Sequence, residues 1–298
     1  MNMSAGQATM QGETIRSQRY YTIMKRLTAI AVYGLLGVWC LLSLYPMAIM
    51  VINSFKSDAE MYINPAGPPI EWTLASYGKV LQYHGGMLQN YINAVVVAGT
   101  STVLAVFLCA LAAFAFAKYR FPGRNLIFSL LLATMMVPPE ITIPGLYITF
   151  AKLQWINTLR AQILPTVTPI LGLFFIRQYM MDIPDALLEA ARIDGAGHWT
   201  LFWKIMVPTS APVLGAYAIL HFMSVWNADT WPVLVATKAQ VQPIIVILPQ
   251  MVDPIIGFLP VWGTIMAGCV LSTLPLLIVF VAFQDRFMSS VVIGAVKE

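Results

Sequence analysis

Charged residues are scarce in this chain. Only 10% of its 298 residues are Asp, Glu, Lys or Arg, whereas 59% are hydrophobic. A soluble domain normally carries about 25% charged residues, so this chain cannot cover its apolar surface with polar side chains. The composition therefore predicts an integral membrane protein, with no stretch long and polar enough for a separate soluble catalytic domain.

Motifs for catalysis and metal binding are also missing from the sequence. It contains no G-x-x-x-x-G-K-[ST] phosphate loop, so we expect that this chain does not itself bind or hydrolyse ATP. Nucleophile elbows and paired-carboxylate motifs are absent as well. Three cysteines lie within apolar runs and offer no disulfide or metal framework: Cys40, Cys109 and Cys269. Three histidines are scattered without metal-binding spacing: His84, His198 and His221.

Long apolar runs dominate what remains. Each approaches or exceeds the roughly 20 residues that a helix needs to cross the hydrocarbon core. The first run has no small-residue cleavage site and exceeds the length of a signal-peptide core, so we expect it to be retained. We predict an all-α domain over residues 27–283, between a polar tail (1–26) and a short tail (284–298). Its six spans are expected at 27–53, 90–117, 125–149, 160–181, 209–231 and 259–283.

The distribution of positive charge predicts the orientation of these spans. Cytoplasmic loops of membrane proteins are enriched in Lys and Arg. Both termini are therefore predicted to be cytoplasmic. Twelve of the seventeen Lys and Arg residues then lie on the inside or at its boundary: Arg16, Arg19, Lys25, Arg26, Lys118, Arg120, Arg124, Arg177, Arg192, Lys204, Arg286 and Lys297.

The connections between the spans differ in character. Residues 54–89 are turn-rich and predict an exterior loop with short interfacial helices, and 151–159 a short exterior loop. Residues 232–258 predict a second long exterior segment, whose apolar middle fits either a half-inserted or a surface helix. In the third span, three prolines forbid an unbroken helix, and a broken helix at membrane depth needs protein or a cavity to cover it: Pro138, Pro139 and Pro144.

The most charged segment between two spans is 182–208. Asp182 and Pro184 favour a helix start and Gly195 a helix stop. At helical spacing a polar arc contains Asp185, Glu189 and Arg192. The opposite arc is apolar and contains Ala186, Leu187, Ala190 and Ile193.

A second helix is expected after residues 195–197. It would end at Pro208 and present one aromatic and Met face, formed by Trp199, Phe202, Trp203 and Met206. Such a face suits docking to another protein. It equally suits an interfacial loop whose aromatic rings lie at headgroup level. Amphipathicity alone does not separate these alternatives.

The spacing within this loop favours docking. The pattern is Glu189-Ala190-Ala191-x3-Gly195-x9-Ile205-x-Val207-Pro208. It resembles the EAA signature of permease subunits from ATP-binding-cassette (ABC) importers, with Val207 where Leu is usual. Further stretches resemble the carbohydrate-uptake branch, similar to the maltose permease G-type subunit: Ile183-Pro184, Leu188, Ile193-Asp194, Pro144-Gly145-Leu146-Tyr147, Ile156-Asn157-Thr158-Leu159, Trp226-Asn227, Trp231-Pro232 and Gly294-Ala295-Val296-Lys297.

The resemblance implies a type I ABC importer permease fold in a bacterial inner membrane, with no catalysis by this chain. It also implies a docking role for the loop, which in this family inserts into a cleft on the ATPase subunit. The coupling residues would be Glu189, Ala190, Ala191, Asp194, Gly195, Ala196, Gly197 and His198. A tail reaching between the ATPase subunits would comprise Gly294, Ala295, Val296 and Lys297, although Glu298 stands where the family often has Gly.

The partners implied by the resemblance are a second, homologous permease, two ATPase subunits and an extracytoplasmic solute-binding protein. ATP and Mg²⁺ would bind to the ATPase subunits, and the chain itself would hold no cofactor or metal. The substrate would be a sugar or oligosaccharide, whose identity the sequence does not give. The alternative from another functional class is a secondary transporter driven by an ion gradient, but charge pairs within the spans and an inverted repeat are not evident.

Five residues are candidates for the substrate path, because aromatic faces and amides suit sugar recognition. An ionisable group at membrane depth is also a functional candidate. Each has a structural alternative: Glu140 would be hydrated at the exterior end, Asp229 would cap a helix, and the aromatic residues would pack or lie in the interfacial belt. The candidates are Glu140, Tyr147, Trp226, Asn227 and Asp229.

Overall fold

The protein is described from a computed structural model. It places the backbone of residues 3–83, 87–252 and 259–295, and the side chains of 24–83, 87–252 and 259–282. Within these ranges every regular element is a helix, and the one extended pairing is an isolated antiparallel bridge between Val252 and Pro260. The predicted all-α class is confirmed.

Three helices are long and apolar enough to cross a membrane unbroken. They are α1 (Met3–Asn53, with its membrane segment at Met24–Asn53), α4 (Leu88–Lys118) and α15 (Trp262–Ala295, with its membrane segment at Trp262–Ala282). These helices lie where the first, second and sixth spans are predicted. At about 1.5 Å per residue, each membrane segment reaches the thickness of the hydrocarbon core.

Each of the other three predicted spans corresponds to a bent pair of helical segments. The segments would give six spans in total if each pair crosses once, by length and composition. The first pair, α5 and α6, is bent by 95°, the second, α7–η2 and α8, by 41°, and the third, α10–α11 and α12, by 76°. Their bounds are α5 Arg124–Thr134, α6 Pro139–Lys152, α7 Leu159–Ile163, η2 Leu164–Thr166, α8 Ile170–Met181, α10 His198–Leu201, α11 Val207–Thr209 and α12 Ala211–Trp226.

Prolines explain two helix ends. The break in the third span precedes Pro138 and Pro139, as predicted, and these residues become the N-cap and first residue of α6. The fifth span is shorter than predicted, since α12 ends at Trp226 rather than 231 and the chain restarts as α13 (Thr230–Val235). Pro232 lacks the N–H that would bond the Ala228 carbonyl and its ring would clash there, so one continuous helix cannot form.

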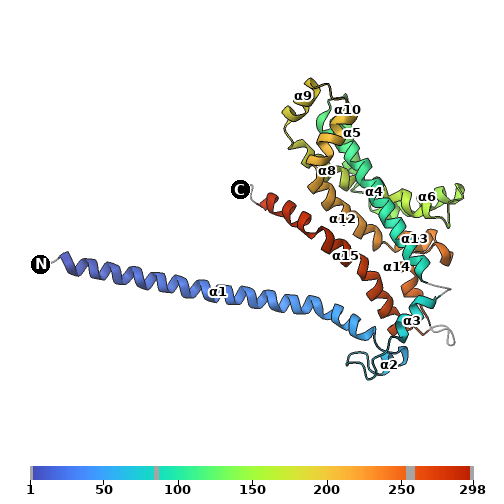
Figure 1. The fold of residues 1–298 in the computed structure, drawn as a ribbon, viewed down its shortest axis with the longest axis horizontal. Coiled ribbons are helices and arrows are strands. Elements are labelled where there is room, and N and C mark those ends of the chain that lie inside the picture. The colour runs from blue at the N-terminus through green and yellow to red at the C-terminus, as the bar shows by residue number, and fades with distance from the viewer. Residues whose placement is uncertain (1–2, 84–86, 253–258, 296–298) are drawn as a thin grey trace.

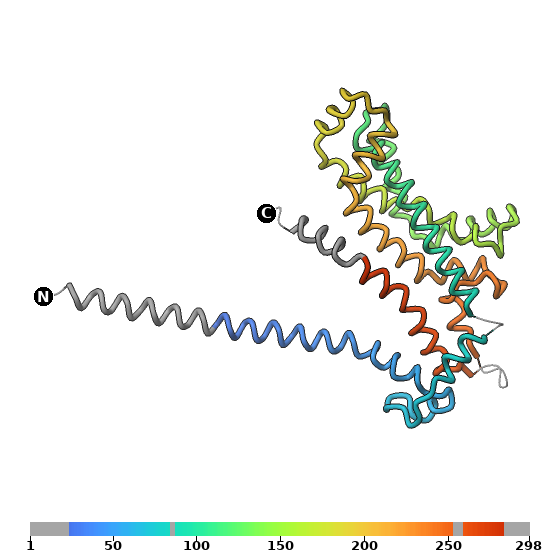
Figure 2. Tube along the Cα trace, in the orientation of Figure 1, coloured from blue at the N-terminus to red at the C-terminus, as the bar shows by residue number. Residues whose placement is uncertain are grey.

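The bundle is centred on α4. This helix packs against α8 and α12, and α12 packs against α15 (Figure 1). By contrast, α1 leaves the bundle and packs against α15 near its own C-terminal end, as the described part of its trace shows in Figure 2. Its membrane segment is uncovered along most of its length, with Leu35 and Trp39 70% exposed or more. In a bilayer this surface must meet lipid or another transmembrane helix.

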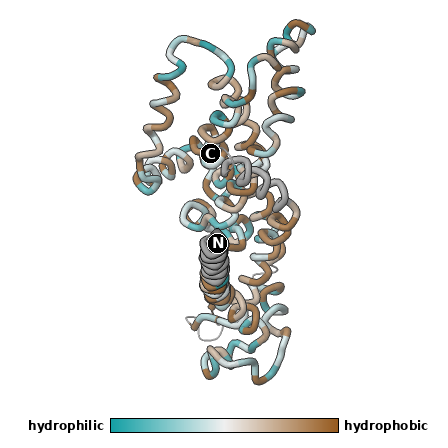
Figure 3. The backbone as a smooth tube through the Cα atoms, turned by 90° about the vertical axis from the view of Figure 1, so that its left-hand side faces the viewer, coloured by the Kyte–Doolittle hydropathy of each residue, from teal (hydrophilic) through white to brown (hydrophobic). Residues whose placement is uncertain are grey.

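The bundle has two polar ends joined by hydrophobic helices (Figure 3). The coupling end comprises residues 118–124 and 182–210 and is predicted to be cytoplasmic. The exterior end comprises residues 54–83, 152–163 and 230–252. Its first part forms the short helices α2 (Asp58–Ile63) and α3 (Ala75–Gln82), as predicted for the exterior loop.

The second exterior segment is packed into the bundle. It forms η4 (Ala239–Val241), α14 (Ile244–Ile247) and η5 (Leu248–Gln250), and its apolar middle is buried against α4 and α15. Three amide side chains donate hydrogen bonds to its irregular backbone: Asn90 to Ala239 O (2.6 Å) and Gln242 O (2.8 Å), Asn93 to Gln240 O (2.8 Å), and Gln162 to Val241 O (2.9 Å). These bonds satisfy carbonyls that an irregular segment would otherwise leave unpaired, and the burial favours the half-inserted alternative.

Candidate functional site

The predicted helix–glycine–helix is present at the coupling end. Its first helix, α9, runs over Asp185–Ile193 with Pro184 as its N-cap, and it ends before Gly195. The Gly195 backbone has φ +85°, a left-handed conformation that residues with a Cβ disfavour. The amide of Ala196 then bonds Ala191 O at 2.9 Å, which closes the turn. The predicted start and stop of α9 are confirmed.

The surface of α9 that the chain itself leaves uncovered includes its apolar arc. Leu188 is the buried residue of the helix and holds it to the bundle at 2% exposure. Leu187 is 48% and Ile193 86% exposed. Among the predicted coupling residues, Ala191 and Ala196 are half-buried, and the others are exposed: Glu189, Ala190, Asp194, Gly195, Gly197 and His198. Loop 182–208 therefore presents a mixed polar and apolar surface away from the bundle.

The second helix differs from its prediction. It consists of α10, a π-helical turn over Phe202–Met206, and α11. Phe202 and Met206 are buried at 1% and 0%, whereas Trp199 and Trp203 are 61% and 52% exposed. The four side chains thus do not form one exposed face: Phe202 and Met206 turn into the bundle, and Trp199 and Trp203 lie on the exposed side.

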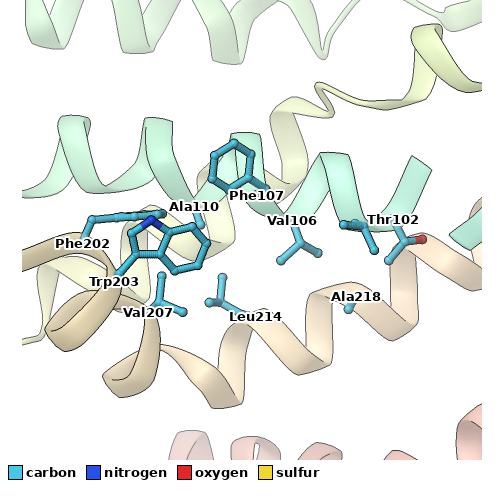
Figure 4. A pocket seen from close by; sticks show the side chains of 10 residues that line it. Thr102, Val106, Phe107, Ala110, Phe202, Trp203, Val207, Leu214 and Ala218 are labelled. Atoms are coloured by element: carbon cyan, nitrogen blue, oxygen red, sulfur yellow. The ribbon is translucent and has the colours of Figure 1, made fainter. Parts of the chain in front are cut away.

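Aromatic rings pack this second helix against α4. Trp203 stacks on Phe107 of α4, with ring centroids 6.0 Å apart and an interplanar angle of 15°. Phe202 packs against Phe114, also of α4, at 5.8 Å. Beside these rings lies an apolar cavity of about 270 Å³ between α4 and α12, which reaches from Trp203 to Thr102 (Figure 4). A displacement of the second helix would therefore act directly on α4 through these ring contacts.

Two side chains at the end of α4 fasten the loop. Lys118 Nζ donates to Ile183 O (2.5 Å) and forms an ion pair with Asp185 Oδ1 (2.7 Å). Tyr119 Oη lies 2.6 Å from His198 Nδ1, within hydrogen-bonding distance. One fastening holds the start of α9 and the other the start of α10, so the loop is held at two points.

The Lys118–Asp185 pair predicts a pH dependence for the loop. The hydrogen bond from Lys118, followed by its charge, lowers the Asp185 pKa from its ordinary 3.8. A carboxylate with a lowered pKa stabilises the folded loop fully above pH 3.8, and this contribution is lost as the pH falls through the lowered value. Amide hydrogen exchange of residues 183–193, corrected for intrinsic rates, should speed up across that window in the native protein. In Asp185→Asn the exchange should be fast already at pH 7; equal protection in both proteins at pH 7 would contradict the role of the pair.

The substrate-path candidates come from two parts of the chain, 226–229 and α6. Trp226 is buried (3% exposed), packs edge-to-face on Tyr91, and donates from Nε1 to Ser272 O (3.2 Å), which supports its packing alternative. Asn227 is exposed and donates to Met223 O of its own helix at 2.8 Å. Asp229 precedes α13 as its N-cap residue, is exposed, and accepts from the Thr230 hydroxyl at 3.0 Å.

The other two candidates lie on α6. Glu140 is in its first turn and Tyr147 two turns later, on the same face, and both are exposed. Among the described residues, no hydrogen bond or ring contact joins them to the candidates around Trp226. The helices that contain them are nevertheless in contact, since Phe150 of α6 packs against Trp231 of α13 at 5.7 Å. The role of the five residues in a path stays a prediction.

The coupling-loop pattern lies within a longer match to known proteins. Residues 105–292, more than half of the chain, match the family described as binding-protein-dependent transport system inner membrane component. The chain belongs to this family. As a permease of this family it is a membrane transport component, and the inner membrane is its location.

Curated relatives cover nearly the whole permease. It is 31% identical over 259 residues to the arabinooligosaccharides transport system permease protein AraQ of Halalkalibacterium halodurans, covering 86% of this chain and 92% of AraQ. It is 29% identical over 275 residues to the diacetylchitobiose uptake system permease protein NgcG of Streptomyces coelicolor, covering 92% and 90%. The sn-glycerol-3-phosphate transport system permease protein UgpE of Yersinia pestis is 30% identical over 269 residues, covering 87% and 94%.

A solved structure shares the fold of the permease. A chain of a bacterial ABC transporter for import of the acidic polysaccharide alginate superposes with a TM-score of 0.77 at 22% identity, covering 88% of this permease and 97% of that chain. A second structure, of an alginate transporter in complex with an alginate-bound periplasmic protein, gives a TM-score of 0.64 at 15% identity, covering 88% and 94%. The type I permease fold is thereby confirmed.

Two functional residues are not indicated by the sequence, and part of the predicted tail lies outside the described residues. In the sequence, Lys118 contributes only its positive charge to the predicted topology and Tyr119 carries no signal, because nothing local indicates their partners 67 and 79 positions away. In the predicted tail, Val296 and Lys297 lie outside the described residues. Gly294 and Ala295 are the last two residues of α15, and the Ala295 side chain is not among those described. The ATPase-interface role of this tail stays a prediction.

Proposed function

We propose that this chain is one of two permeases in an ATP-driven importer of a sugar or oligosaccharide. The observation that carries the proposal is the coupling loop, which is exposed outward yet fastened inward at Lys118, Tyr119 and Trp203. Two ATPase subunits would bind ATP and Mg²⁺ and receive the exposed surface of α9. Their closure would shift the equilibrium of the spans between outward- and inward-facing states. The size of that shift would equal the difference in the affinity of the ATP-bound ATPase for the two states.

The uncovered surface of α1 supports a second permease. An apolar segment of 30 residues that the rest of the chain leaves uncovered contributes little to the packing of its own bundle. Shape-fitting contact with another transmembrane helix would stabilise it through van der Waals packing. In a pore made by two permeases, each chain would supply part of the wall.

The substrate class rests on the relatives. AraQ and NgcG are named for arabinooligosaccharides and diacetylchitobiose, and UgpE for sn-glycerol-3-phosphate. Two of these three named substrates are oligosaccharides, and the third is a small polyol phosphate. The exposed Tyr147 and Asn227 offer an aromatic face and an amide, the groups that bind sugar C–H faces and hydroxyls. We therefore place an oligosaccharide first.

No observation favours the ion-driven alternative. A secondary transporter would need ionisable groups paired within its spans. In the described part of the chain both ion pairs lie at the ends of the bundle, Lys79–Asp58 at the exterior end and Lys118–Asp185 at the coupling end.

Reconstitution tests the proposed function. The chain would be placed in proteoliposomes with its partner permease, ATPase subunits and solute-binding protein, and uptake of a radiolabelled oligosaccharide panel would be measured. Uptake is expected only with ATP and Mg²⁺ inside, and it should persist when ionophores collapse the ion gradients. Uptake that follows an ion gradient and continues without ATP would overturn the proposal.

A further inference from the structure

Part of the exterior end has charge of one sign. Lys152, Arg160 and Lys238 belong to it, and no acidic residue occurs in 141–181 or 230–252. Positive charge on the outer side of a membrane runs against the usual inward bias of Lys and Arg. Topology therefore does not account for these three cations, unlike the basic residues of the coupling end.

The fold brings the three cations to one corner. Lys152 is in the last turn of α6, and Arg160 is in the short helix α7 that follows. The loop between them is joined to the segment after α13 through Asn157. Its Oδ1 accepts from Lys238 N (2.9 Å) and Thr237 N (2.8 Å). We name Lys152, Arg160 and Lys238, with the loop 153–159 between them, the basic corner.

The backbone of this corner is held firmly. Asn157 has φ +63°, and its backbone N–H donates a hydrogen bond to Val235 O at 2.7 Å. Behind it Phe150, Ala161 and Val235 form a small buried cluster. Trp231 closes that cluster and donates from Nε1 to Ala161 O at 2.7 Å. The positive charges therefore stand on a preformed support rather than on a free loop.

The cations themselves are free to meet a partner. All three side chains are exposed, and none makes an ion pair with a residue that the structure describes. An acidic residue borders each stretch at both ends: Glu140 and Asp182 for the first, Asp229 and Asp253 for the second. Glu140 and Asp229 make no ion pair with the corner. By contrast, Lys79 at the same end of the molecule is already paired with Asp58 at 2.6 Å.

We propose that the basic corner is a docking point for an acidic surface on the extracytoplasmic solute-binding protein. This inference rests on the proposed function, because it presupposes a solute-binding protein. Fixed positive charges around a rigid, exposed loop can match fixed negative charges on a folded partner. They would steer its approach and set its orientation more than they would add affinity.

A protein partner suits the corner better than a sugar or a lipid. A sugar site would be concave, whereas the three cations are exposed and do not line the apolar cavity between α4 and α12. Lipid headgroups are mobile and do not require preformed positions. Exposed apolar side chains at the corner, Leu153 (49%) and Val233 (46%), add the apolar contact that protein interfaces combine with a charged rim.

Charge neutralisation tests the inference. The complete complex would be embedded in nanodiscs of zwitterionic lipid, and binding of the purified, substrate-free cognate solute-binding protein would be measured by biolayer interferometry. Lys152→Gln/Lys238→Gln is expected to weaken binding about tenfold at roughly 50 mM salt and little at roughly 500 mM, because salt screens exposed charges. The matched control, Lys79→Gln, removes an exterior cation that is already paired and should leave binding near that of the native complex.

The outcomes separate the alternatives. Equal binding by the double variant and the native complex, while ATP-driven transport continues, would overturn the docking point and leave the proposed function standing. A loss that occurs only in nanodiscs containing anionic lipid would assign the corner to headgroups and overturn the proposal. Neutralising acidic residues on the solute-binding protein should cause no further loss in the double variant if these are the partners of the corner. Failure of the native complex to transport with ATP would count against the proposed function itself.

Discussion

Gly195→Val is expected to uncouple the permease from ATP hydrolysis while leaving its spans inserted. At φ +85° a residue with a Cβ incurs about 1–2 kcal/mol of strain, and a β-branched residue more. Nothing lies within 4 Å of a Cβ at this position, so the effect comes from the backbone and not from a clash. The turn would open and α9 would lose the orientation in which its exposed surface meets the ATPase.

The size of this effect follows from the strain. A cost of one to two kcal/mol corresponds to roughly five- to thirtyfold weaker docking, measured as ATPase retained on the purified permease and as ATP-driven uptake. Gly78→Ala is the matched control, because Gly78 lies in α3 at the exterior end, away from the coupling loop, and also has open space around its Cβ position. Normal ATPase retention and uptake in Gly195→Val would show that the turn is not part of the coupling.

Gly172→Ala is expected to destabilise the whole bundle. Gly172 of α8 lies so close to α12 that an added methyl group would overlap the ring of Tyr217, which is itself buried at 5% exposure. Small residues allow transmembrane helices to approach closely. Overpacking at such a contact costs about 1–3 kcal/mol, which should appear as a lower thermal unfolding midpoint and a lower yield of monodisperse protein.

A control and a rescue make this second prediction specific. Gly99 of α4 has nothing within 4 Å of its Cβ position, so Gly99→Ala should be neutral or slightly stabilising, as Ala favours helix more than Gly. Adding Tyr217→Leu to Gly172→Ala removes the overlapping end of the ring and should recover part of the lost stability. The close-approach argument fails if both alanine variants unfold at the same temperature.

The features that the sequence predicts well are those that depend on neighbours along the chain. Apolar length marks α1, α4 and α15, and paired prolines mark the break before α6. Gly195 marks the end of α9 because a left-handed residue is a local requirement. The coupling loop could be located for the same reason, since its spacing is contained within one short segment.

Contacts between distant segments could not be predicted in this way. The fastening of Asp185 by Lys118 and the support of Lys238 by Asn157 join residues more than sixty positions apart. The π-helical turn at 202–206 also escaped, because the sequence pattern of an α-helix fits those residues equally well. The burial of Phe202 depends on Phe114 of α4, which is far away in the sequence, and it leaves Trp199 and Trp203 as the exposed rings of the second helix.

One consequence follows from the position of α4. At one end its Lys118, Phe114 and Phe107 hold the coupling loop, and at the other Asn90 and Asn93 hold the carbonyls of 239–242. With 31 residues the helix is about 46 Å long. One straight helix therefore connects the two ends of the bundle. A tilt of about 10° about one end would displace the other end sideways by roughly 8 Å. Under the proposed function, a small tilt of α4 caused by the ATPase at the coupling end would thus become a displacement of several ångströms at the exterior end. No intermediate conformational change would be needed.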